Sequence, residues 1–146
     1  MKQLAVKNYN NLAEQKIEQN GNEFIVKYVF PTTEAKQCNV SVVEVEPGNY
    51  AWGYHYHEIN EEVFYIISGK ATVRTINGEI NVKAGDIITF PTGEEGSHVI
   101  SNASKDEKLV YLDFDTANPA EIVHFPDIDK IMAIGPYSNG MYDINA

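Results

Sequence analysis

Two of the four histidines in this 146-residue chain form the segment His55-Tyr56-His57. Alternate residues of a β-strand share a face, so both imidazoles can reach one ion if the segment is extended. Glu62 follows five residues later, and His98 lies behind a loop long enough to bring it alongside. Three imidazoles and one carboxylate suit a divalent transition metal. The sequence therefore predicts a metal site with Mn, Fe, Ni, Co, Zn or Cu.

Short extended segments separated by turns must position these residues. Turn signals recur from about residue 20 to residue 105. The predicted strands are Glu23–Phe30, Val40–Glu46, Trp52–His57, Glu62–Ser68, Ala71–Ile76, Glu79–Val82, Asp86–Phe90, His98–Asn102 and Leu109–Asp115. Asn77-Gly78 predicts a tight hairpin. About nine strands indicate a sandwich or jelly roll.

The two ends of the chain are less regular. Leu12–Gln19 predicts a short helix, and the stretch after Thr116 adds one candidate strand, Glu121–Phe125, followed by a turn-rich end. This end is too short for a core of its own. We expect it to pack on the barrel, to cover its mouth or to contact a partner.

The aligned histidines and glycines resemble the two motifs of the cupin superfamily. The first motif is matched by Gly48, His55, His57, Glu62 and Gly69, and the second by Gly85, Pro91, Gly93, His98 and Asn102. The spacing is one residue longer than usual before His55 and two residues longer before His98. The resemblance covers roughly residues 40–115 and implies an all-β double-stranded β-helix, a cupin-type jelly-roll barrel, with the metal inside. It implies His55, His57, Glu62 and His98 as the ligands and a structural or supporting role for Asn102.

The resemblance also implies the domain organisation. We expect one cupin domain over residues 1–146, with a barrel core at about 24–115 between short extensions, the C-terminal one covering 116–146. Glu61 is a competing carboxylate, but Glu62 is preferred because it stands six residues before Gly69 and shares strand parity with Phe64 and Ile66. Glu58 and Glu61 are expected to be solvated, and His124 to be an ordinary, partly buried histidine.

Charge excludes several classes of partner. The chain has 21 acidic against 11 basic residues, a net charge of -10, and no cluster of lysine and arginine. Nucleic acids and anionic membrane surfaces are therefore not expected partners. The one arginine, Arg74, is expected to face solvent, which disfavours phosphorylated substrates. The start of the chain has no apolar stretch long enough for a signal peptide, and Cys38 is the only cysteine, so we expect a cytoplasmic protein.

Four protein ligands on an octahedral ion leave two positions for water or substrate. The favoured function is a metal-dependent enzyme acting on a small oxygen-rich organic molecule, of an isomerase, epimerase or dioxygenase type. The alternative is a non-catalytic binding or sensing module in which the metal holds the ligand or the fold. A second titratable group near the metal would favour the enzyme, whereas a dry apolar pocket would favour the binding module.

The strand after Glu62 predicts a homodimer. If Glu62, Phe64 and Ile66 face the interior, then Val63, Tyr65 and Ile67 face outward, and an apolar outer face needs a cover. The cover is a terminal segment of the same chain or a second subunit, most often in a two-fold contact.

Overall fold

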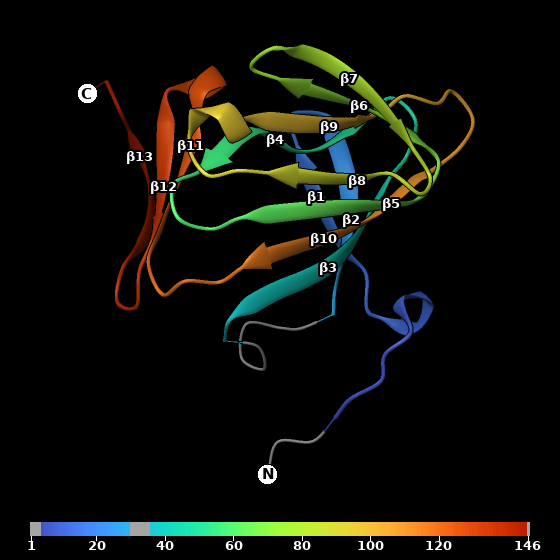
Figure 1. The fold of residues 1–146 in the computed structure, drawn as a ribbon, viewed down its shortest axis with the longest axis horizontal. Helices are drawn as coiled ribbons and strands as arrows, with labels where there is room; N and C mark the ends of the chain where they lie inside the picture. The colour runs from blue at the N-terminus through green and yellow to red at the C-terminus, as the bar shows by residue number, and fades with distance from the viewer. Residues whose placement is uncertain (1–3, 30–35, 146) are drawn as a thin grey trace.

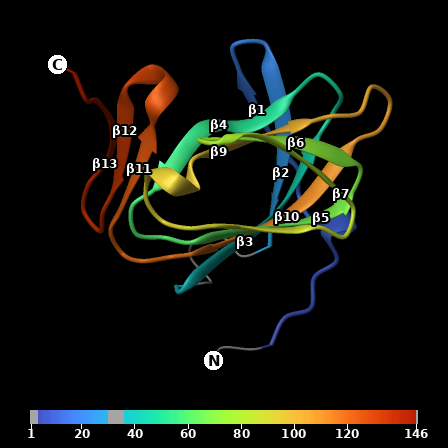
Figure 2. The same cartoon turned by 45° about the horizontal axis from the view of Figure 1, so that its top comes forward.

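Two antiparallel sheets face each other and enclose the core (Figures 1 and 2). The computed structural model describes residues 4–29 and 36–145. One sheet has the strand order β1-β2-β3-β10-β5-β8 and the other β13-β12-β11-β4-β9-β6-β7. The strands in the described part of the chain are β1 (Gln15–Gln19), β2 (Asn22–Tyr28), β3 (Cys38–Val45), β4 (Tyr50–His57), β5 (Glu62–Ser68), β6 (Lys70–Thr75), β7 (Gly78–Lys83), β8 (Ile87–Phe90), β9 (His98–Asn102), β10 (Leu109–Thr116), β11 (Glu121–Phe125), β12 (Lys130–Ile134) and β13 (Asn139–Asp143).

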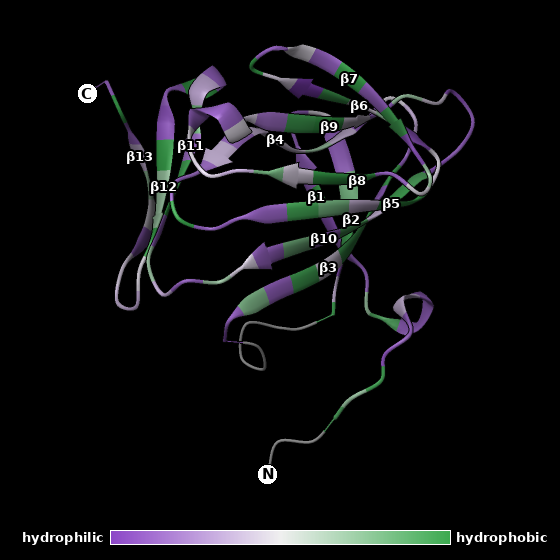
Figure 3. Ribbon diagram, in the orientation of Figure 1, coloured by the Kyte–Doolittle hydropathy of each residue, from purple (hydrophilic) through white to green (hydrophobic). Residues whose placement is uncertain are grey.

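This arrangement is an all-β double-stranded β-helix, as the resemblance to the cupin superfamily implies. Three short 3₁₀ helices interrupt the strands: η1 (Tyr9–Asn11), η2 (Glu94–Gly96) and η3 (Pro126–Ile128). Apolar residues gather in the barrel strands (Figure 3), because alternate side chains of each strand point between the sheets. Phe64, Ile66 and Tyr111 are among the residues of that core.

Residues Leu12–Gln19 do not form the predicted helix. Gln15–Gln19 is strand β1, which pairs with β2, and Ile17 packs against the core. Asn20 and Gly21 both have positive φ, 53° and 79°, which suits a two-residue hairpin turn. The turn therefore folds this segment back onto β2 as a strand. Phe30, where the sequence predicts that β2 ends, lies outside the described residues.

The C-terminal extension lengthens the sheet that contains the histidines. The predicted strand Glu121–Phe125 is confirmed as β11, and it pairs with the end of β4. Strands β12 and β13 continue the same sheet outward, and all three lie together at one side of the barrel in Figure 1. Of the three places considered for this extension, packing on the barrel is the one observed.

Strand β4 contains an irregularity that the alternation of its sequence does not reveal. Trp52 and Gly53 have positive φ, 70° and 112°, and the register against β9 shifts between Ala51 and His55. The Trp52 ring therefore packs against the hydrophobic core, with its centroid 4.9 Å from the ring centroid of Phe24. Simple alternation along Trp52–His57 would place Trp52 on one face with Tyr54 and Tyr56, but the bulge separates Trp52 from them.

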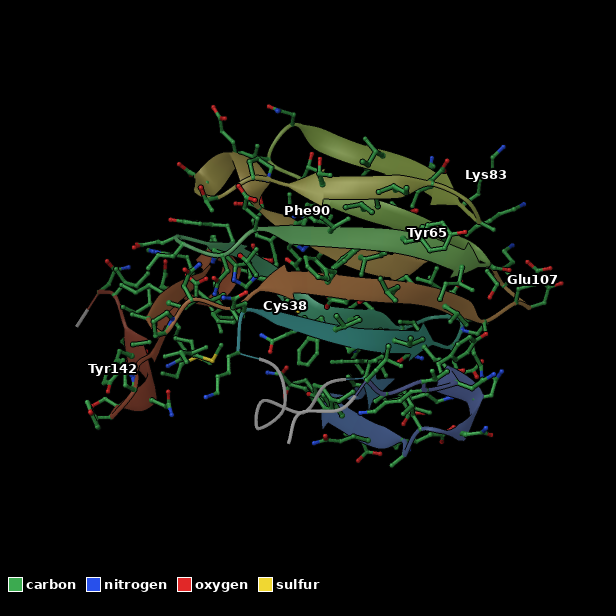
Figure 4. The ribbon with its side chains drawn as sticks, turned by 60° about the horizontal axis from the view of Figure 1, so that its bottom comes forward. Cys38, Tyr65, Lys83, Phe90, Glu107 and Tyr142 are labelled. Carbon is green, nitrogen blue, oxygen red and sulfur yellow. The ribbon has the colours of Figure 1, made fainter. Side chains whose placement is uncertain are left out.

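The outer face of β5 is apolar and open. Tyr65 lies opposite Leu112 of β10 and Ile87 of β8, and its side chain is on the ribbon of β5 in Figure 4. Tyr65 is 43% exposed and Ile87 is 66% exposed. The C-terminal strands do not cover this face, since they join the opposite sheet. The N-terminal segment contacts the same sheet farther away, where Glu14 lies 3.7 Å from Lys27 of β2.

None of the helices within residues 4–29 and 36–145 is both long and apolar enough to cross a membrane.

Candidate metal centre

Three strands bring the predicted ligands together inside the barrel. His55 and His57 come from the end of β4, Glu62 begins β5, and His98 begins β9 directly opposite His55. All three imidazoles face the same carboxylate oxygen. Glu62 Oε2 lies 3.6 Å from His55 Nε2, 3.3 Å from His57 Nε2 and 3.2 Å from His98 Nε2. His55, Glu62 and His98 are buried, and their ligand atoms all lie within 4.8 Å of one another.

Backbone carbonyls orient two of the imidazoles. His55 Nδ1 lies 2.8 Å from the carbonyl oxygen of Gly53, and His98 Nδ1 lies 2.8 Å from that of Gly96. Because a carbonyl only accepts, Nδ1 carries the proton in both rings and Nε2 presents its lone pair to the interior. This is the arrangement that metal-bound histidines use.

His57 stands slightly apart from this group. It is the most exposed of the three rings, and it joins the others through Glu62 and through an edge contact with the ring of His55, with ring centroids 5.2 Å apart. Its Nδ1 lies 3.6 Å from Oε2 of Glu121, on β11. The C-terminal extension therefore holds the outer side of the centre, at the ring nearest to solvent.

The charges of the centre are strongly coupled. Burial alone would raise the pKa of Glu62, but its contacts with the three imidazoles outweigh burial and hold that pKa well below its ordinary range. Burial lowers the pKa of His98, in spite of Glu62. For His57, burial acts in the same direction, but Glu62, Asp115 and Glu121 outweigh it and raise the pKa. Glu62 is thus an anion, and His98 is neutral, which are the forms that bind metal.

Several buried atoms of the centre have no hydrogen-bond partner among the described residues. They include Oε2 of Glu62, Nε2 of His98 and both ring nitrogens of His57. Unsatisfied buried polar atoms are costly, and three of them, Oε2 of Glu62 and Nε2 of His57 and His98, are directed at one small region. A divalent transition metal fits this donor set, because it would take the lone pairs of the imidazoles and the carboxylate together.

The inner face of β10 adds polar groups that sequence reasoning missed. Asp115 lies opposite Glu62 and Asp113 lies opposite Phe64 in the register of β10 and β5. Burial, followed by the charges of Glu62 and Asp115, raises the pKa of Asp113 well above its usual range. Burial and Glu62 raise the pKa of Asp115 to about 7. The alternation of Tyr111, Asp113 and Asp115 with apolar residues was the sequence signal for this stripe.

Glu121 is the second group that sequence reasoning missed. It is 4% exposed, and its carboxylate accepts hydrogen bonds from the backbone N–H groups of Ile59 (3.1 Å), Asn60 (2.7 Å) and Ile122 (2.8 Å). It thereby fixes the loop between β4 and β5, which connects two of the strands that carry the candidate ligands. Nothing in its sequence surroundings distinguishes it from an ordinary exposed glutamate.

The remaining candidates lie outside the centre. Glu61 and Glu58 are exposed, and Glu58 contacts His124 Nε2 at 2.7 Å. His124 is partly buried and stacks on the ring of Tyr56. Arg74 forms a double hydrogen bond with Asp127 on the surface.

Asn102 joins the backbones of two strands and a loop. Its Nδ2 donates to the carbonyl oxygens of Val45 (2.7 Å) and Glu107 (2.8 Å). This supports the structural role that the motif implies for it.

Comparison with known protein families shows to which family the chain belongs. A family model described as a cupin domain matches residues 41–115, about half of the chain. The chain belongs to the cupin family. Among curated proteins, an oxalate decarboxylase of Arthroderma benhamiae is 31% identical to this cupin over 121 residues, which are 80% of this chain and 27% of that protein. This cupin thus spans about a quarter of the length of the curated relatives it matches.

Solved structures show the same fold. A putative sugar phosphate isomerase from Acidithiobacillus ferrooxidans has a TM-score of 0.84 at 22% identity, covering 97% of this cupin and 92% of that chain. A predicted oxalate decarboxylase from Thermotoga maritima has a TM-score of 0.68 at 23% identity, covering 78% of this cupin and 100% of that chain. Likeness at such identities establishes a shared architecture, on which different chemistries are built.

Proposed function

We propose that this cupin is a metal-dependent enzyme acting on a small oxygen-rich organic molecule. The metal ligands are His55, His57, Glu62 and His98. One observation carries the proposal: three imidazole nitrogens lie 3.2–3.6 Å from a single buried oxygen of Glu62. A divalent ion bound there would polarise a carbonyl or hydroxyl oxygen of the substrate or acidify a bound water.

Groups beside the ligands favour catalysis over passive binding. Asp113 and Asp115 place two further titratable carboxyls on the interior surface next to Glu62. A site that only held a ligand or the fold would need no such groups, because buried carboxyls destabilise the protein unless they are paired. Perturbed titratable groups beside a metal site are typical of active sites.

The charge of the interior bears on the substrate class. Lys27 is the only buried lysine or arginine in the described part of the chain, and it points away from the barrel interior toward Glu44. Arg74 is paired with Asp127 on the surface. Neither the buried Lys27 nor Arg74 is therefore directed at a phosphate in the barrel. We propose a substrate without phosphate, such as a small hydroxy-carbonyl compound, and isomerisation or epimerisation as its reaction.

Metal analysis tests the site. Protein purified without a histidine tag should hold metal, and the double variant His55→Ala/His57→Ala should release it, because two imidazole ligands are lost. His124→Ala is the matched control, since this histidine lies outside the centre and should leave the metal content unchanged. A double variant that still holds one equivalent would show that the ligand assignment is wrong.

Hydrogen exchange at carbon tests the reaction class. An isomerase or epimerase that removes a proton next to a carbonyl should exchange that hydrogen for deuterium in D₂O, which proton NMR detects. We expect exchange with unphosphorylated hydroxy-carbonyl compounds in the metal-loaded wild type and none in His55→Ala/His57→Ala. Metal binding without any exchange would instead support the binding or sensing module.

The exposed face of β5 supports a homodimer. Tyr65 and Ile87 form part of an apolar surface that no described terminal segment of the same chain covers. Light scattering should give a mass near twice 16.4 kDa, and Tyr65→Lys should reduce it to that of one chain. Tyr142→Lys, at a similarly exposed tyrosine on β13, is the control. A monomeric wild type at micromolar concentration would refute the dimer.

A further inference from the structure

Three carboxylates meet on the inner surface of β5 and β10. Glu62 and Asp115 are directly opposite in the strand register, and Asp113 is the next inward residue of β10. Ligand oxygens of the three residues all lie within 4.8 Å of one another. Glu62 is 3% exposed and Asp113 is 6% exposed, so the cluster belongs to the interior and not to a solvated surface.

No buried lysine or arginine of the described residues compensates this cluster, and only the imidazoles of the histidine site, on the side of Glu62, act against its charge. The imidazoles face Oε2 of Glu62, and the only buried lysine among the described residues is directed to Glu44 instead. Oδ1 of Asp113 and Oδ1 of Asp115 have no hydrogen-bond partner among the described residues. Like charges this close and this poorly solvated repel strongly. The cluster therefore requires a bound positive charge, which is either a cation or an added proton.

An unpartnered hydroxyl lies on the same face of β10. Tyr111 precedes Asp113 by two residues on this inner face, is fully buried, and its hydroxyl has no hydrogen-bond partner among the described residues. Burial raises the pKa of Tyr111 well above its usual range, and the charges of Asp113, Glu62 and Asp115 add to this effect. A buried phenol without a partner is unusual, and this one feels the charge of all three carboxylates.

We propose that Glu62, Asp113 and Asp115 hold a second divalent cation, with the carboxylate of Glu62 shared between it and the histidine site. The donors are all oxygen, which selects a hard cation of the Mn²⁺, Mg²⁺ or Ca²⁺ type over Zn²⁺ or Cu²⁺. Two ligands of one ion are separated by at most twice the metal–oxygen distance, about 4.2 Å for Mg²⁺ and about 5 Å for Ca²⁺. Ligand oxygens within 4.8 Å of one another meet the limit for Ca²⁺ directly, and Mg²⁺ would draw them to within about 4.2 Å of one another. The resulting centre has two ions, one with imidazole ligands and one with carboxylate ligands only.

Manganese titration tests this second site. Metal-depleted wild-type protein is titrated with Mn²⁺, and bound metal is counted by equilibrium dialysis. We expect two equivalents, and electron paramagnetic resonance should show two coupled ions, because a shared carboxylate holds them close together. Asp113→Asn/Asp115→Asn should bind one equivalent and show the signal of an isolated Mn²⁺ ion. Glu79→Gln, which removes an exposed negative charge from β7, should still bind two.

Each outcome decides between the two sites. One equivalent in the wild type that is kept in Asp113→Asn/Asp115→Asn and lost in His55→Ala/His57→Ala would overturn the second site. Two equivalents in Asp113→Asn/Asp115→Asn would overturn the assignment of its ligands. Zero equivalents would refute the histidine site as well, so failure of the proposed function is distinguishable. If the double variant does not fold, the count and the coupling in the wild type still decide.

Discussion

Replacing Gly96 by alanine tests whether the backbone around η2 sets the metal affinity. Gly96 is not one of the proposed metal ligands, but its carbonyl oxygen accepts the hydrogen bond from Nδ1 of the proposed ligand His98. A Cβ on Gly96 would lie 1.9 Å from the carbonyl oxygen of Pro91, roughly 1.5 Å closer than the shortest ordinary contact of 3.4 Å. Both partners in this clash are backbone, so no side chain can rotate to relieve it. The backbone must move, and the carbonyl that orients His98 moves with it.

The size of the effect follows from two known costs. Overpacking a buried site costs about 1–3 kcal/mol of the free energy of unfolding. For a chain of this size that corresponds to a fall in Tm of roughly 3–10 °C. Disturbing the partner of a metal-bound histidine lowers metal affinity about 10- to 100-fold. We therefore expect Gly96→Ala to be both less stable and a weaker metal binder.

Thermal unfolding of the metal-free protein and metal titration by calorimetry measure the two effects separately. Gly48→Ala is the matched control: Gly48 also precedes a ligand-bearing strand, and its φ of 83° makes alanine strained, but its Cβ would meet nothing within 4 Å. This variant should lose about 1–2 kcal/mol of stability and keep its metal affinity. If Gly96→Ala binds metal as tightly as Gly48→Ala, the carbonyl of Gly96 does not position His98.

Three further predictions concern charge. Metal affinity should fall as the pH is lowered from 7.5 to 5.5, because protons compete with the metal for the imidazoles, and carboxylate neighbours raise the pKa of His57 against the effect of burial. Competition with a chromophoric chelator measures the affinity at each pH. A constant affinity would exclude imidazole ligands. Burial opposes ionisation of Glu44, but two lysines outweigh it and lower its pKa from 4.5. The stability from this pairing is present above pH 4.5 and is lost as the pH falls through the lower folded value. Urea unfolding of wild type and Glu44→Gln should therefore differ at pH 7 and converge once the pH is below that folded value. Glu121→Ala should lower the free energy of unfolding by about 2–3 kcal/mol and the metal affinity about 10-fold. Glu58→Ala, which removes an exposed carboxylate, is the control. Equal metal affinities in the two variants would contradict a supporting role for Glu121.

The sequence predicted most of the barrel because its signals are local. Alternating apolar residues and turn dipeptides mark single strands, and the parity of Glu62 with Phe64 places the carboxylate inside without any knowledge of its neighbours. Asn20-Gly21 carried the same kind of signal for β1, since this dipeptide favours a hairpin, but the short segment before it also fits a helix. Pairing with β2 makes this segment a strand and not a helix, and that pairing depends on tertiary structure.

What the sequence could not predict depends on distant partners. The bulge at Trp52 arises from how β4 meets β9, and neither strand shows it alone. Glu121 supports the loop between β4 and β5 only because β11 lies beside β4. In the sequence it is more than sixty residues from the backbone N–H groups that donate hydrogen bonds to it. Asp113 and Asp115 are readable as an inward stripe, yet their importance comes from the register that places them beside Glu62.

The short contact between β11 and β4 has a kinetic consequence. Two residue pairs join these strands in register, Val123 with His57 and His124 with Tyr56, and the hydrogen bonds that Glu121 accepts from the loop after β4 complete the attachment. Segments at the edge of a fold open locally more often than the whole chain unfolds. Detachment of β11 to β13 would free the outer side of His57 while His55, Glu62 and His98 stay in place. The rate at which a bound metal ion is released to solvent should then follow the rate at which strands β11 to β13 detach. Substitutions at residues that do not contact the metal could therefore change its release rate.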